Sequence, residues 1–179
     1  MGQDARVILR GSVELDLPEG RRHLSPALEA SGGDLSPTAY QLKISGTQPM
    51  EVFVSRSGRR FLAKVISSEG EQVREFRAGP GSILLDDLIA HQHHLLLPYL
   101  NQDSAVSLSV LSPRTGTQVR MTLREMGPEE VRVGTELVQG THFRLEGGEG
   151  SHEIWFDDQG RILRVAVPAR GYVAERESL

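Results

Sequence analysis

The chain has 179 residues, a formal net charge of −4 and 38% hydrophobic residues, and it contains no cysteine. A chain of this length can bury roughly 70% of the surface that it exposes when unfolded, so a hydrophobic core is feasible without crosslinks. The absence of cysteine excludes disulfides, thiol catalysis, cysteine zinc sites and iron–sulfur clusters. Nucleic acid requires a basic surface, so no nucleic-acid partner is expected for this slightly acidic chain.

The sequence contains no apolar run close to the about 20 residues that a membrane-spanning helix needs. No basic N-terminal segment precedes a long apolar stretch either. We therefore predict no transmembrane segment. We expect a periplasmic or secreted protein whose signal peptide has been removed, with a cytoplasmic location as the alternative.

Short segments of alternating apolar and polar residues follow one another through the first half of the chain, separated by Gly, Pro, Asp and Ser. This spacing is typical of antiparallel all-β folds. Strands are expected at residues 7–17, 40–44, 51–55, 61–67, 72–77 and 82–86. Residues 21–37 have no such period and contain many turn-forming residues, so they are expected to form a long loop.

One segment, from about residue 86 to residue 97, has the period of a helix. Asp86 or Asp87 can cap its first turn by accepting a hydrogen bond from a free backbone N–H. Pro98 disfavours the helical conformation for Leu97, so the helix is expected to end there.

The second half of the chain has the clearest alternation. Strands are expected around residues 105–110, 118–123, 131–137, 142–146, 151–156 and 163–167, with turns at Pro113–Gly116, Gly127–Pro128, Gly140, Gly147–Gly148 and Gly160. Residues 168–179 are expected to form an irregular tail. The whole chain, residues 1–179, is predicted to be one all-β domain, a twisted antiparallel sheet or half-barrel of about nine or ten strands curled around a single helix.

The hairpin around Gly147 allows its register to be predicted. Apolar side chains should face apolar ones, and the charge of Arg144 should face the opposite charge of Glu153. The register that satisfies both conditions consists of the pairs Glu146–Ser151, Leu145–His152, Arg144–Glu153, Phe143–Ile154 and His142–Trp155.

The stretch Glu153-Ile154-Trp155-Phe156-Asp157-Asp158-Gln159-Gly160-Arg161-Ile162-Leu163-Arg164-Val165 resembles the closing hairpin of uncharacterised bacterial envelope or secreted proteins of unknown function. Ile83–Asp87, Leu111–Pro113 and Arg176 belong to the same resemblance, which covers residues 82–176. The resemblance implies an exported protein with an antiparallel sheet curled around a helix, similar to the half-barrel of lipoprotein carriers. It implies no catalytic residues.

Three histidines, His91, His93 and His94, lie in the predicted helix. Asp87, His91 and His94 can share one helical face, and these are the candidate metal ligands, because imidazole and carboxylate suit zinc. Three ligands within two turns of one helix rarely converge without a ligand from elsewhere, and Asp87 with His91 also forms an ordinary helical pair. No metal or other cofactor is therefore expected.

A hydrolase would need a nucleophile, a base and an oxyanion site, and the sequence contains no Gly-x-Ser-x-Gly motif. Ser151, His152 and Glu153 are consecutive, but consecutive strand residues point to alternate faces and cannot act as a triad. No catalytic residue is predicted, and the chain is expected not to be an enzyme.

Trp155 lies between Ile154 and Phe156, so this strand is apolar on both faces. A helix of about eleven residues is ~16 Å long and cannot cover about ten strands spaced ~4.8 Å apart. Something must cover each face of the strand. One possibility is that the helix covers one face and the curl of the sheet covers the other. The other is that an apolar surface is left for a ligand, which predicts an apolar ligand groove with the loop at 21–37 across its mouth. The predicted groove residues are Leu88, Leu95, Tyr99 and Trp155.

The expected function is non-enzymatic binding of an apolar or lipid-like ligand or of another envelope component. A structural interaction module without a small ligand is the first alternative. A metal-dependent enzyme that uses the helix histidines is the second.

Overall fold

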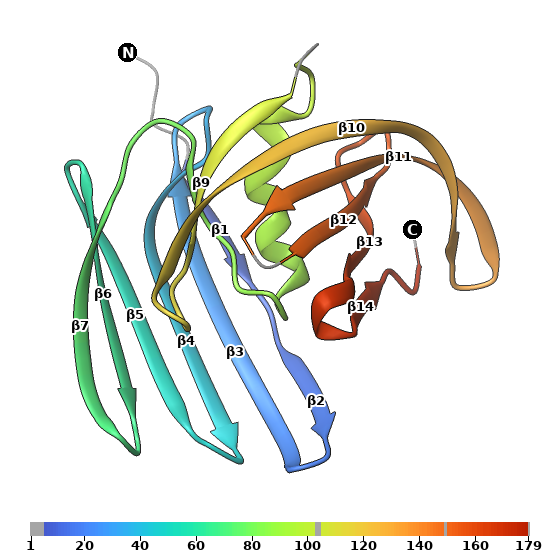
Figure 1. Cartoon of the computed structure of the whole chain (residues 1–179). Coiled ribbons are helices and arrows are strands. Elements are labelled where there is room, and N and C mark those ends of the chain that lie inside the picture. The colour runs from blue at the N-terminus through green and yellow to red at the C-terminus, as the bar shows by residue number, and fades with distance from the viewer. Residues whose placement is uncertain (1–5, 103–104, 149, 179) are drawn as a thin grey trace. The chain divides into compact units, whose positions relative to one another are not determined.

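The computed structural model of this chain describes residues 6–102, 105–148 and 150–178 (Figure 1). The chain divides into two compact units, of which the first comprises Met1–Gln92 and Leu111–Gln118 and the second His93–Val110 and Val119–Leu179. The fold class is all-β, as predicted. No helix in the described part of the chain has both the length and the apolar character needed to cross a membrane.

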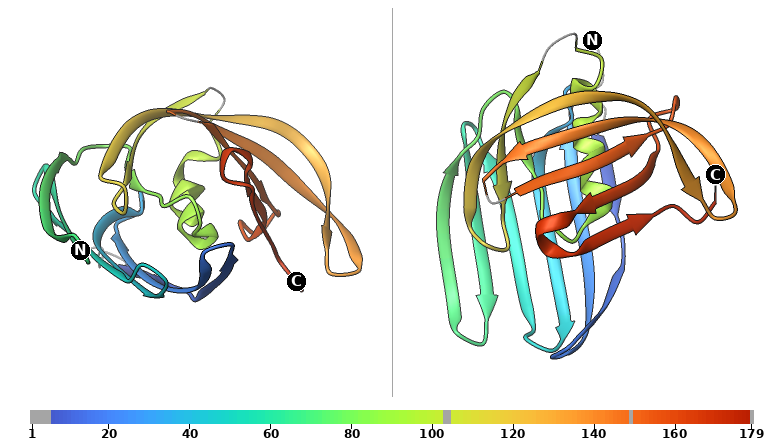
Figure 2. Two further views of the ribbon diagram at one scale, coloured as in Figure 1. Left: turned by 60° about the horizontal axis from the view of Figure 1, so that its bottom comes forward. Right: turned by 45° about the vertical axis from the view of Figure 1, so that its right-hand side comes forward.

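The first unit contains a curled antiparallel sheet (Figure 2). Its strands are β1 (Arg6–Arg10), β2 (Val13–Leu17), β3 (Gly20–Ser31), β4 (Ser36–Gly46), β5 (Met50–Ser57), β6 (Arg60–Ser67) and β7 (Gly70–Arg77). They follow the order β1-β3-β4-β5-β6-β7, and β2 also pairs with β3. Neighbouring strands from β3 to β7 are joined by hairpins, because each is followed in the chain by the strand that it pairs with.

Alternate residues of this sheet form the core of the first unit. On β3 and β4, for example, Leu28 and Leu42 are fully buried while their neighbours Glu29 and Gln41 are not. Each buried leucine contributes roughly 1.5–3 kcal/mol from the removal of apolar surface from water. The sheet therefore has one buried face and one face that carries the remaining side chains.

Most of residues 21–37 lie in β3 and the start of β4, with only a short turn at 32–35 between the strands, so the prediction of a long loop there is wrong. Pro26 is one of the turn-forming residues in this segment. In an antiparallel strand the backbone N and C=O of one residue point to the same side of the strand. The Pro26 C=O accepts a hydrogen bond from the Gly11 N–H at 3.2 Å, so the Pro26 nitrogen also points toward Gly11. The missing N–H of Pro26 therefore faces the gap between β1 and β2 and removes no hydrogen bond to β4.

The second sheet has the order β14-β13-β12-β11-β10-β9-β8. Its strands are β8 (Ser82–Leu84), β9 (Val106–Ser112), β10 (Thr117–Val133), β11 (Glu136–Gly147), β12 (Gly150–Phe156), β13 (Ile162–Val167) and β14 (Tyr172–Glu175). Two 3₁₀ helices complete the structure, η1 (Ala90–Tyr99) and η2 (Pro168–Arg170). Strand β8 and the turn between β9 and β10 belong to the first unit.

The predicted register of the β11–β12 hairpin is confirmed at every pair, from Glu146–Ser151 to His142–Trp155. The side chains of Arg144 and Glu153 form an ion pair with 2.9 Å between Nε and Oε1. The opposite charges of Arg144 and Glu153 are therefore a correct indicator of the faces of both strands.

Several boundaries differ from the sequence prediction. Strand β10 continues past Gly127–Pro128, because a bulge between Glu125 and Gly127 absorbs the extra residue without ending the strand. The predicted irregular tail contains η2 and β14, and β14 pairs with β13. The described residues form 14 strands, more than the nine or ten expected, partly because 7–17 divides into β1 and β2.

The helix begins at Ala90 instead of residue 86, and it includes Pro98. Asp86 does not cap it with its side chain. The Asp86 carboxylate is buried and accepts hydrogen bonds from Tyr40 and Ser112, which hold it outside the helix.

Candidate functional site

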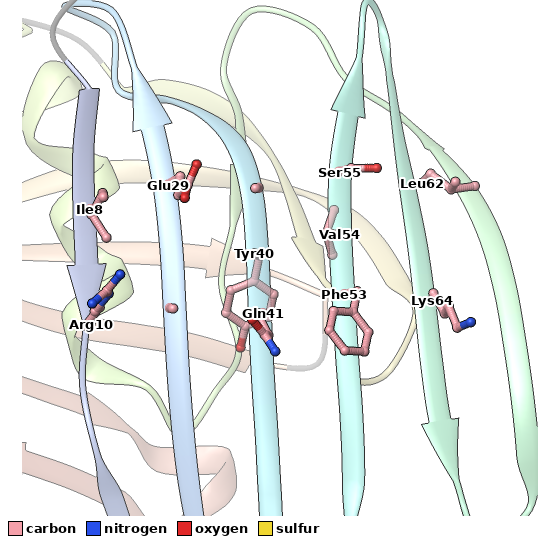
Figure 3. A pocket seen from close by; sticks show the side chains of 12 residues that line it. Ile8, Arg10, Glu29, Tyr40, Gln41, Phe53, Val54, Ser55, Leu62 and Lys64 are labelled. Atoms are coloured by element: carbon pink, nitrogen blue, oxygen red, sulfur yellow. The ribbon is translucent and has the colours of Figure 1, made fainter.

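A hollow lies on the face of the first sheet opposite its core (Figure 3). Its volume is about 490 Å³, within the range of roughly 300–1,000 Å³ typical of ligand pockets. Two cross-strand rows of side chains form it. The first row is Ile8, Glu29, Ala39, Ser55 and Leu62, and the second is Arg10, Ala27, Gln41, Phe53 and Lys64.

The hollow exists because two neighbouring central strands contribute alanine to this face. Ala27 of β3 and Ala39 of β4 have one-carbon side chains, whereas the residues around them are larger. Side chains on one face of a sheet stand roughly parallel, so two short ones leave a depression in the layer. We call this depression the sheet hollow.

The walls of the sheet hollow are partly apolar. Ile8 is 45% exposed and Leu62 is 44% exposed, and half-buried Phe53 lies between them on β5. Polar residues normally occupy the open face of an antiparallel sheet. Exposed apolar residues around a depression are a common feature of binding surfaces, which makes the sheet hollow the candidate site.

Ion pairs surround the apolar part of the sheet hollow. Glu29 pairs with Arg6 at 2.6 Å, and Lys64 pairs with Glu71 at 2.7 Å. These exposed pairs contribute little to stability, about 0–1 kcal/mol each. Their effect here is to neutralise two of the charges that line the hollow.

The sheet beneath the hollow is fixed by a buried polar cluster. Tyr40 lines the hollow from below, and its hydroxyl donates to Asp86 Oδ2 at 2.8 Å. Asp86 Oδ1 accepts from the Ser112 hydroxyl at 2.8 Å and from the Arg114 backbone N–H at 3.2 Å. The cluster therefore ties β4 to the segment before η1 and to the turn between β9 and β10.

Burial raises the pKa of the Tyr40 hydroxyl and of the Asp86 carboxyl above their ordinary values. The nearby charge of Arg114 opposes the shift at Asp86 without cancelling it. Both groups lie away from solvent, with Asp86 only 1% exposed. We interpret them as structural groups that hold the sheet and not as groups that touch a ligand.

The predicted groove residues lie in different parts of the structure. Leu88 belongs to the first unit and is half-buried, while Leu95, Tyr99 and Trp155 belong to the second. Leu95 is fully buried and Tyr99 is half-buried. Trp155 points to the face of β12 opposite His152, whereas His152 is the residue that contacts η1, through His93 at 3.0 Å.

Trp155 is covered on its own face. Val131 and Val133 of β10 pack with it in one hydrophobic cluster, together with Leu163 and Ala166, and the indole is 7% exposed. The face of β12 that carries Trp155 is therefore covered by side chains of β10 and β13.

Polar side chains complete the surroundings of Trp155. Its ring stacks on His142 with 4.4 Å between centroids, and the Arg164 guanidinium lies 5.2 Å from the indole centroid. The indole N–H donates to Glu129 Oε2 at 2.9 Å.

Glu153 connects this group to the hairpin. His142 Nε2 lies 2.7 Å from Glu153 Oε2. Burial alone would raise the pKa of the Glu153 carboxyl, but hydrogen bonds from His142, Arg144 and Ser151 hold it below its usual value. We interpret the arrangement as a packed structural cluster.

The candidate metal ligands are also divided between the two units. Asp87 and His91 belong to the first and His94 to the second, and all three are half-buried. Among residues 6–102, 105–148 and 150–178, no group of three or more His, Asp or Glu side chains is placed to hold a metal ion.

Residues 83–177, more than half of the chain, match the family model described as Domain of unknown function (DUF6134). The chain belongs to this family. No curated protein and no solved structure matches the chain. The family segment starts at β8, so β1 to β7, and with them the sheet hollow, lie outside it.

Sequence reasoning did not identify the sheet hollow. The double-sided apolar character of Val52-Phe53-Val54 was the available signal, because Phe53 had to lie on the face opposite the two valines. The sequence does not predict the alanine floor, because Ala27 lies in the segment 21–37 that is expected to be a loop. A loop residue cannot be placed on either face of a sheet.

Proposed function

We propose that this protein is a non-enzymatic binding protein and that the sheet hollow takes an apolar or lipid-like ligand. One observation carries the proposal: a depression of about 490 Å³ on the open face of the first sheet, with an alanine floor and with Ile8, Phe53 and Leu62 around it. Its shape and lining suit an alkyl chain, which needs apolar contact and no directional hydrogen bonds.

The expected binding is reversible and of moderate strength. Each methylene group that leaves water contributes about 0.8 kcal/mol when it is fully buried, and a depression that is open on one side buries only part of each group. The loss of ligand freedom on binding further reduces the net affinity. A ligand held in this way can be passed on to another component, which would suit the exported envelope protein that the sequence predicts.

A fluorescent fatty-acid probe tests the proposal directly with the whole chain. We expect saturable binding to one site. Ala39→Phe fills the floor of the hollow and should weaken binding at least tenfold, while the fold survives because aromatic residues suit an exposed sheet face.

Ser45→Phe is the matched control, since Ser45 lies on the same strand and the same face but outside the hollow. It should bind the probe as the unmodified chain does. Circular dichroism would verify that both variants are folded. Absence of saturable binding to the unmodified chain, or equal binding by the Ala39→Phe variant, would overturn the proposal and favour a structural interaction module.

A further inference from the structure

One positive charge at the sheet hollow forms no ion pair with any residue that the structure describes. Glu29 is paired with Arg6, and Lys64 is paired with Glu71. Arg10 also lines the hollow, and its side chain makes neither a hydrogen bond nor an ion pair within the described part of the chain. The sheet hollow therefore combines an alanine floor with a guanidinium that has no ion-pair partner among the described residues.

Arg10 lies at one end of the hollow. It pairs with Ala27 across β1 and β3, Ala27 pairs with Gln41, and Gln41 pairs with Phe53. The path from β1 to β6 covers four strand-to-strand steps, which is about 19 Å at ~4.8 Å each. Figure 3 shows Arg10 at the β1 side and Phe53 and Leu62 at the opposite side.

An alkyl chain laid across the strands would pass over Ala27 and Ala39 and end against Phe53 and Leu62. The other end of such a molecule would then lie at Arg10. Guanidinium donates two parallel hydrogen bonds to a carboxylate or a phosphate, which is the best match that one side chain offers to an anionic head group. Because Arg10 is exposed, the head group would keep most of its water.

We propose that the ligand of the sheet hollow is an anionic single-chain amphiphile, with its head group paired to Arg10 and its alkyl chain over Ala27 and Ala39. This inference rests on the proposed function, and it adds the charge class of the ligand. It also assigns Arg10 as the residue that sets the orientation of the chain across the strands.

Isothermal titration calorimetry with three ligands of equal chain length tests the inference. Dodecanoate carries a negative head group, dodecanol a neutral one and dodecyltrimethylammonium a positive one, and each is used below its aggregation concentration. Dodecanoate should bind about tenfold more tightly than dodecanol, and the cationic ligand should bind more weakly than either. The preference for dodecanoate should decrease at high salt, because the paired charges are exposed.

Arg10→Gln should abolish the preference for the anionic ligand, so that the ratio of the dodecanoate affinity to the dodecanol affinity falls from about ten to about one. Arg59→Gln is the matched control, because it removes the same charge from an exposed turn of the same unit outside the hollow. It should change none of the three affinities by more than about twofold.

The outcomes separate the two proposals. If none of the three ligands binds, the proposed function fails. If dodecanol binds as tightly as dodecanoate, or if Arg10→Gln and Arg59→Gln affect dodecanoate equally, the proposed function stands and the assignment of Arg10 is overturned.

Discussion

Asp86→Ala is expected to lower the free energy of unfolding by about 3 kcal/mol or more, while Asp86→Asn should cost much less. The buried Asp86 carboxylate accepts hydrogen bonds from the Tyr40 hydroxyl, the Ser112 hydroxyl and the Arg114 backbone N–H. Removing it leaves these donors without an acceptor, at about 1–3 kcal/mol for each buried group. Asparagine keeps one oxygen for Ser112 and Arg114 and can turn its amide toward the Tyr40 oxygen.

The difference in stability between Asp86→Asn and the unmodified chain should change with pH in a direction that can be predicted. Burial raises the pKa of Asp86 in the folded protein above its unfolded value of about 3.9. The folded state therefore holds the proton more tightly, and the contribution of Asp86 to stability decreases as the pH rises from about 4 through the raised folded value. Asp86→Asn has no such titration, so its stability relative to the unmodified chain should improve between pH 4 and pH 7.

Urea unfolding followed by circular dichroism at both pH values measures these differences. Other carboxyls, such as Glu153 with its lowered pKa, titrate equally in all the variants and cancel in the comparison. A variant with asparagine that is as unstable as the one with alanine would show that Asp86 is not the acceptor at the centre of this cluster.

Gly46→Ala is expected to destabilise the protein by more than about 2 kcal/mol, because two costs combine at this position. Gly46 has φ +94°, a conformation that residues with a Cβ rarely adopt, and such strain costs about 1–3 kcal/mol. A Cβ there would also overlap the backbone oxygen of Arg21 on the paired strand β3. Backbone cannot move aside as a flexible side chain can, so β3 and β4 would have to separate locally.

Gly58→Ala is the matched control for this prediction. Gly58 has φ +58°, and a Cβ there would meet nothing within 4 Å. Only the left-handed backbone penalty applies, about 1–2 kcal/mol. Since about 1 kcal/mol corresponds to roughly 2–4 °C for a chain of this size, the melting temperature should fall clearly further for Gly46→Ala than for Gly58→Ala. Equal shifts would contradict the close approach of β4 to Arg21.

The features of this fold that can be predicted from the sequence depend on residues close together in the chain. Alternation of apolar and polar residues correctly located most strands, and the charges of Arg144 and Glu153 were sufficient to fix the β11–β12 register. The predictions of secondary structure were wrong at residues whose structural role depends on the partner strand. Pro26 breaks no ladder because its nitrogen faces the gap beside Gly11, and Gly127 continues a strand through a bulge. Neither the orientation of the Pro26 nitrogen nor the bulge at Gly127 can be derived from the identity of the residue alone.

The candidate site was harder to predict for the same reason. The predicted groove includes Trp155, and the sequence does not indicate that Val131 and Val133 pack with it in one cluster. The sheet hollow depends on Ala27 and Ala39 being neighbours on one face, which is a consequence of the β3–β4 register and its shift between Glu29 and Ala30. Such a depression becomes visible only when strands distant from one another along the sheet are assembled.

Photolabelling with a fatty acid that carries a diazirine in its alkyl chain is the most direct test of the proposed ligand site. The whole chain is irradiated with the probe, with and without excess unlabelled fatty acid, and the labelled residues are mapped by mass spectrometry. We expect competable labels on the strands that line the sheet hollow, at or beside Ile8, Phe53 and Leu62. Competable labels around Leu88, Leu95, Tyr99 or Trp155 in place of these, or no competable label at all, would contradict the account.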